Sequence, residues 1–141
     1  MRALPGVGLL EPPHVSLGYP WLPADEALAR VEDVRAAAGR VPAFGAGLTG
    51  PHTFAPDGRG RVLVHARLAD DAPVRVLAGL LGADLREVHL SLARVLPGGD
   101  LPAVLEALAP LLPRLVAVRV LELTVRRAGV WSTGTTAGLG G

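Results

Sequence analysis

Two short stretches of the chain place a histidine two residues before a serine. They are HVSL at residues 14–17 and HLSL at residues 89–92. The chain contains only 4 histidines and three serines, so chance placement would rarely give two such pairs. In a β-strand, side chains two residues apart point to the same face. Each stretch therefore predicts an imidazole and a hydroxyl on one strand face, with apolar residues anchoring the other.

An imidazole and a hydroxyl on each of two facing strands suit the chemistry of a phosphodiester. Imidazole titrates near pH ~6.5, so at neutral pH one histidine can take up a proton while another donates one. His14 and His89 could serve the attacking and departing oxygens, while Ser16 and Ser91 donate hydrogen bonds to the non-bridging phosphate oxygens. We expect no cofactor and no metal, because the sequence has no cysteine and few carboxylates near either stretch.

The residues around both stretches resemble those of the 2H phosphoesterase superfamily, specifically its 2′-5′ RNA ligase-like branch. PPHVSLGYPWLP at residues 12–23 is similar to the first motif of that family, and HLSLARV at residues 89–95 is similar to the second. The resemblance covers residues 10–131 and includes a late leucine-rich pattern, VRVLELTV. It implies a bilobal α+β fold with a motif in each half.

The resemblance also implies an activity and a set of site residues. The implied activity is that of a metal-independent cyclic phosphodiesterase or 2′-5′ RNA ligase. Its substrate would be a 2′,3′-cyclic phosphate or a 2′-5′ linkage of a nucleotide or RNA terminus. His14 and His89 would be the acid/base pair, and Ser16 and Ser91 would bind the phosphate. Which histidine is the acid, and whether the enzyme works as hydrolase or ligase, stays open.

Other polar and aromatic residues carry weaker signals. Tyr19 and Trp21 follow the first motif and could stack on a base or pack at a proline-flanked strand end. We interpret His52 as a surface residue of a Pro/Gly-rich loop. Arg94 is three residues past Ser91, so regular alternation points it away from the face of His89.

A third histidine lies between two arginines on a predicted strand. His65 shares a strand face with Arg61 and Arg67. This face could be a basic floor for a phosphate, but the pattern favours a solvated face of an antiparallel strand.

Strand and helix periodicities are interspersed along the chain. Strands are predicted at residues 14–19, 43–49, 61–68, 86–95 and 115–127. Helices are predicted at residues 24–38, 73–82 and 100–112, the first stopped by Gly39 and the last capped by Asp100. Residues 50–60 are predicted to be a loop or hairpin connection.

This order of elements favours the α+β class over a doubly wound α/β fold. We predict bilobal, pseudo-symmetric antiparallel sheets with flanking helices, as in 2H phosphoesterases. The prediction places a single domain of two small lobes at residues 1–131 and a flexible Gly/Thr-rich tail at residues 132–141.

The composition excludes several classes of protein. With 14 basic and 13 acidic residues in 141, the net charge of +1 argues against a general nucleic-acid coat. No apolar run reaches the ~18 residues that a membrane helix needs, and the N-terminus lacks a signal-peptide pattern. We therefore expect a soluble, cytoplasmic protein that binds no membrane. The sequence does not determine the oligomeric state, although a monomer is favoured.

Two other functions compete with the enzyme hypothesis. Only 13 residues precede His14, so the strand that members of the resembled family usually have before the first motif is expected to be short, displaced or missing. This feature favours the alternative of a catalytically weak or inactive family member that binds nucleotide or RNA ends. The third hypothesis is a protein-interaction module whose histidines lie at the surface. The discriminating observation is whether both His–Ser faces point into one cleft, with the imidazoles of His14 and His89 within a phosphate's reach of each other. Placement of the two histidines on opposite surfaces would rule out the catalytic hypothesis.

Overall fold

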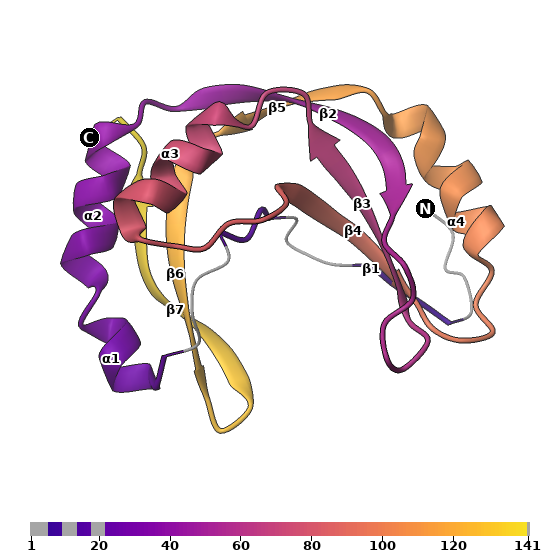
Figure 1. Ribbon diagram of the computed structural model, residues 1–141, viewed down its shortest axis with the longest axis horizontal. Helices are drawn as coiled ribbons and strands as arrows, with labels where there is room; N and C mark the ends of the chain where they lie inside the picture. The colour runs from indigo at the N-terminus through magenta and orange to yellow at the C-terminus, as the bar shows by residue number, and fades with distance from the viewer. Residues whose placement is uncertain (1–5, 10–13, 18–21, 141) are drawn as a thin grey trace. The chain divides into compact units, whose positions relative to one another are not determined.

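The computed structural model describes residues 6–9, 14–17 and 22–140 (Figure 1). The strands are β1 (Val7–Leu9), β2 (Phe44–Thr53), β3 (Val62–Leu68), β4 (His89–Val95), β5 (Arg114–Val118), β6 (Val120–Arg127) and β7 (Val130–Gly138). The helices are α1 (Ala24–Leu28), α2 (Val31–Arg40), α3 (Ala72–Leu81), α4 (Leu101–Leu108) and the short 3₁₀ helix η1 (Ala109–Leu111).

The strands form two sheets, and the strand pairs with a known register are all antiparallel. One sheet has five strands in the order β1-β4-β3-β2-β5, and the other pairs β6 with β7. The predicted α+β class, with antiparallel sheets and flanking helices, is therefore confirmed. The chain divides into two compact units, one of residues 1–16, 46–70 and 87–116, the other of residues 17–45, 71–86 and 117–141.

In the first unit, α4 covers one face of the five-stranded sheet (Figure 1). Val64 of β3, Ala93 of β4 and Val104 of α4 are each 0% exposed and form the centre of this core. As predicted, Asp100 caps the helix, because its carboxylate accepts a hydrogen bond from the backbone N–H of Ala103 at 3.1 Å. The core thus holds β3 and β4 from one side and leaves their other face for polar residues.

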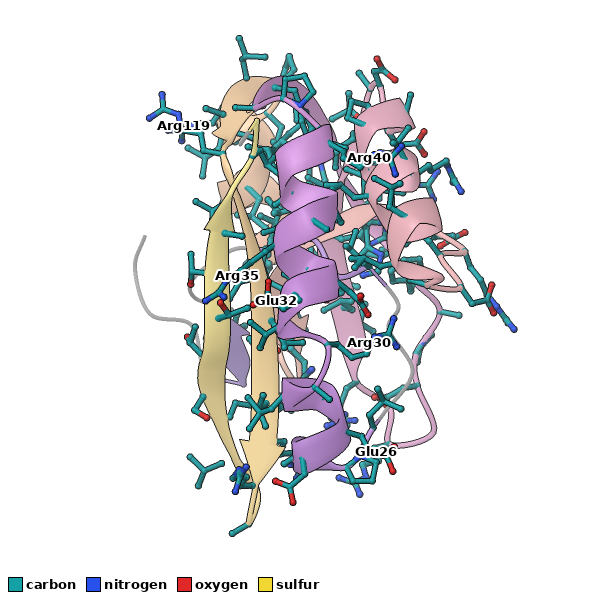
Figure 2. All side chains as sticks on the ribbon, turned by 90° about the vertical axis from the view of Figure 1, so that its left-hand side faces the viewer. Glu26, Arg30, Glu32, Arg35, Arg40 and Arg119 are labelled. Atoms are coloured by element: carbon teal, nitrogen blue, oxygen red, sulfur yellow. The ribbon has the colours of Figure 1, made fainter. Side chains whose placement is uncertain are left out.

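In the second unit, α2 and α3 pack their apolar faces together and against β6. The core contains Val34, Ala38, Leu77 and Leu121. The outer face of α2 is charged, and Figure 2 shows Glu32 and Arg35 side by side there, where they form a 2.7 Å ion pair. This amphipathic division explains why the sequence forms a helix at this place.

Two predicted elements are each divided in the structure. The helix predicted at residues 24–38 is broken into α1 and α2 near Arg30, whose side chain bonds Asp33 and the Leu81 carbonyl. Gly39 does not stop α2, because packing of the neighbouring Ala38 outweighs the helix cost of glycine, about 1 kcal/mol. The strand predicted at residues 115–127 is divided between β5 and β6, which belong to different sheets.

The ends of the chain differ most from the predictions. The tail predicted at residues 132–141 is strand β7 as far as Gly138, because β6 needs a partner and threonines favour extended structure. The strand predicted at residues 14–19 is reduced to one bridge at Val15, while β1 occupies the sheet edge. Residues 18 and 19 lie outside the described part of the chain.

Candidate functional site

Strands β3 and β4 divide their side chains between the two faces of the five-stranded sheet. The face that packs on α4 carries the fully buried Val64 and Ala93. The register pairs His65 with Ser91, so these two side chains share the opposite face. His89 lies two residues before Ser91 and points the same way. We call this surface, with His65, His89 and Ser91, the histidine face.

The first motif joins the histidine face through one bridge at the edge of β4, where Val15 pairs antiparallel with Leu90. In an antiparallel ladder, the residues flanking a pair also lie across from each other and share the other face. Extended by one residue on each side of this bridge, the same register would set the histidine of each motif across from the serine of the other: His14 with Ser91, and His89 with Ser16.

In this register the two imidazoles would lie at diagonal corners of the group, with the hydroxyls at the other two corners. Side chains directly opposite on one face have Cβ atoms about 5 Å apart, and diagonal neighbours about 7–8 Å. His14 and Ser16 are exposed, whereas His89 and Ser91 are half-buried. The two histidines and two serines all belong to the first compact unit. The two motifs are therefore not distributed one to each unit.

His65 is fully buried, which makes the predicted solvated strand face wrong at this residue. Its ring stacks on Phe54 with centroids 4.0 Å apart and meets His89 edge-on at 5.4 Å. Phe54 also contacts His89 edge-on at 5.0 Å. Sequence reasoning missed Phe54, although an aromatic side chain in a chain with 4% aromatics was an available signal.

His52 lies in strand β2 and is half-buried, so its interpretation as a surface loop residue is wrong. The strand extends to Thr53 because the end of β2 pairs with β3, where His52 lies across from His65. A register shift between Thr49 and His52 interrupts the ladder just before this pair. The ring centroids of His52 and His65 are 5.8 Å apart.

A β-bulge turns Arg94 onto the histidine face, contrary to the prediction from regular alternation. The β3–β4 register shifts by one residue beside His65, and beyond the shift Arg94 lies across from Leu63. Leu63 and His65 share a face of β3, so Arg94 shares it as well. On its other side Arg94 lies across from Gly8 of β1, which leaves open space beside it.

Comparison with known proteins identifies the family of this chain. The family model described as the 2′-5′ RNA ligase superfamily matches residues 3–135, which include both motifs. The chain belongs to the 2′-5′ RNA ligase superfamily. No curated protein matches the chain.

Other candidate residues of this superfamily member lie elsewhere. The guanidinium of Arg61 pairs with Asp57 at 2.7 Å in the turn before β3. The backbone N–H groups of Arg61 and Arg59, together with that guanidinium, hold the pKa of Asp57 below its usual range. Tyr19 and Trp21 lie outside the described residues.

Two further observations concern metals and membranes. Within residues 6–9, 14–17 and 22–140, no group of three or more His, Cys, Asp or Glu side chains is arranged to hold a metal ion. No helix in the same part of the chain is long and apolar enough to cross a membrane.

The surroundings of His65 disfavour its charged form. Burial contributes most, and the positive charges of His89, Arg67 and His52 act in the same direction to hold the pKa of His65 below its ordinary value of 6.5. The Leu63 backbone carbonyl opposes this shift. His65 is consequently neutral at neutral pH.

This lowered pKa predicts a pH-dependent stability. Below about pH 6.5, His65 takes up a proton in the unfolded chain more readily than in the folded chain. The free energy of unfolding therefore falls as the pH falls, and this group contributes at most about 1.4 kcal/mol per pH unit. Above that pH the contribution is complete. Urea unfolding of the wild type and His65→Phe at pH values on both sides of 6.5 measures it. Equal losses of stability on acidification in the two proteins would contradict the prediction.

Proposed function

We propose that this protein is a phosphodiesterase that acts on 2′,3′-cyclic phosphate or 2′-5′ linkages of RNA or nucleotides. The observation that carries the proposal is the bridge between Val15 and Leu90, because its antiparallel register would align both His–Ser pairs on one face. Membership of the 2′-5′ RNA ligase superfamily supports a nucleotide or RNA substrate. In this proposal His14 and His89 are the general acid and base.

The diagonal placement of the imidazoles suits the stereochemistry of phosphoryl transfer. The attacking and departing oxygens lie roughly in line through phosphorus, so the base and the acid must act from opposite sides. With a phosphate over the centre of the group, one imidazole takes the proton of the attacking water and the other protonates the departing ribose oxygen. Ser16 and Ser91 then donate hydrogen bonds to the non-bridging oxygens, where negative charge is held.

Two arginines extend the site along β4. Arg67 lies across from His89, and Arg94 lies beyond Ser91 on the same face. Neither forms an ion pair with another described residue. Their positive charges lie toward the two ends of the His–Ser group, where the flanking phosphates of an oligonucleotide would run. The proposal therefore includes short RNA ends among the substrates.

The decisive experiment is hydrolysis of 2′,3′-cyclic nucleotides and short 2′-5′-linked oligonucleotides in the presence of a chelator. We expect turnover that survives chelation and a bell-shaped dependence of kcat/KM on pH, because two imidazoles supply the acid and the base. Activity that disappears with chelator and returns with a divalent cation would overturn the metal-independent mechanism. Binding of the same ligands without turnover would favour an inactive, nucleotide-binding member instead.

A further inference from the structure

Three buried ring nitrogens of the first unit have no hydrogen bond of full geometry in the described structure, although the Leu63 carbonyl lies near enough to the His65 ring to favour its charged form. They are Nδ1 and Nε2 of His65 and Nδ1 of His89, and no other described side chain has a buried nitrogen or oxygen in this state. A buried polar atom left unpaired costs about 1–3 kcal/mol. All three atoms lie in two neighbouring rings whose centroids are 5.4 Å apart. Their concentration at one place on the histidine face calls for a functional explanation.

The two nitrogens of His89 differ in their surroundings. Nδ1 is buried and has no hydrogen-bond partner, whereas Nε2 does not belong to the buried, unpartnered atoms. Nε2 is therefore the nitrogen that can exchange a proton with a substrate. Which ring nitrogen of a neutral histidine carries the proton is set by the hydrogen bond that the other nitrogen makes. An acceptor at Nδ1 would keep the proton there and leave the lone pair on Nε2.

We propose that His65 is this acceptor, so that a hydrogen bond from Nδ1–H of His89 to a ring nitrogen of His65 fixes the tautomer of His89. The inference rests on the proposed function, in which His89 is an acid or base, and makes His65 a positioning residue. With centroids 5.4 Å apart and planes inclined by 67°, small rotations bring a nitrogen of each ring within about 3 Å or admit one bridging water.

The environment of His65 provides what such an acceptor needs. A flip of its ring about χ2 exchanges nitrogen and carbon positions while it preserves the stack on Phe54, and this torsion is soft. His65 must be neutral to accept a hydrogen bond, and the groups that face it are cationic or can become so: His52 from β2, Arg67 from β3 and His89 from β4. With its burial, these charges keep the ring neutral, and the other nitrogen of His65 remains a donor.

Nitrogen NMR of the ¹⁵N-labelled full chain tests the inference without reference to activity. Above the ordinary imidazole pKa, at about pH 8, we expect long-range ¹H–¹⁵N spectra to show His89 with protonated Nδ1 and unprotonated Nε2. His65→Phe keeps a ring on Phe54 but removes the acceptor, and should shift His89 toward the other tautomer. The control Leu111→Phe, at an exposed residue outside the histidine face, should leave the His89 spectrum unchanged. A wild-type His89 protonated at Nε2, or a spectrum unaffected by His65→Phe, would overturn the proposal.

Kinetics provides a second measurement. We expect His65→Phe to lower kcat about 10- to 100-fold with little change in KM, as for other residues that orient an active-site histidine. His65→Gln, which retains a donor and an acceptor, should recover part of that loss. Equal activity of the Phe and Gln variants would argue for a packing role only. If the wild type hydrolyses no substrate, the proposed function fails, while the NMR result still decides whether His65 and His89 form the pair.

Discussion

Replacement of either His14 or His89 by alanine is expected to lower kcat/KM for a 2′,3′-cyclic nucleotide by at least about 100-fold. In the proposed mechanism each substitution removes the group that moves one of the two protons, and solvent water is a poor replacement at neutral pH. In the proposed site the two imidazoles act from opposite sides of the phosphate, so we expect that neither can replace the other. Steady-state kinetics of the purified variants measures the loss.

The double variant separates a joint site from two independent effects. Residues that act as one unit show strongly non-additive losses. The fold-loss of kcat/KM in the double variant should therefore be much smaller than the product of the two single losses. His52→Ala is the matched control, because it removes a half-buried imidazole from the neighbouring region of the same sheet. It should hydrolyse substrate at close to the wild-type rate. Wild-type rates in both His14→Ala and His89→Ala would refute the mechanism.

The second large effect concerns the core beneath the site. Leu108→Ala should lower the free energy of unfolding by about 2–5 kcal/mol, because the truncation leaves a cavity between α4 and the sheet. Leu108 is 5% exposed and packs in the core that includes Val64 and Ala93 of the site strands. Urea unfolding followed by circular dichroism measures the change.

The same helical region supplies a control of the same residue type. Leu111 is 52% exposed, so Leu111→Ala should change the free energy of unfolding by no more than about 0.5 kcal/mol. The Leu108 variant should lose activity only at denaturant concentrations or temperatures that unfold it, because Val64 and Ala93 face away from the histidine face. Similar stabilities of the two leucine variants would contradict the assignment of the core to this side of the sheet.

Much of the local structure follows from the hydrophobic periodicity and the capping residues in the sequence. The alternation Val62, Val64, Ala66, Leu68 predicted β3, and Asp100 predicted the start of α4, because strand period and helix capping are local properties. Gly- and Thr-rich composition was misleading at β7, since its strand forms through pairing with β6, a non-local interaction.

For the candidate site, the sequence by itself determined which side chains share a strand face within each motif. Period two places His89 with Ser91 in β4, and it predicts the same for His14 and Ser16, between which only Val15 forms a bridge. Only the tertiary structure decided how the motifs meet, because the crosswise register depends on one long-range bridge between Val15 and Leu90. It also decided the direction of Arg94, since a bulge inserts one residue and reverses the alternation after it. The burial of His65 was decided in the same way, because the ring of Phe54 reaches it only when β2 pairs with β3.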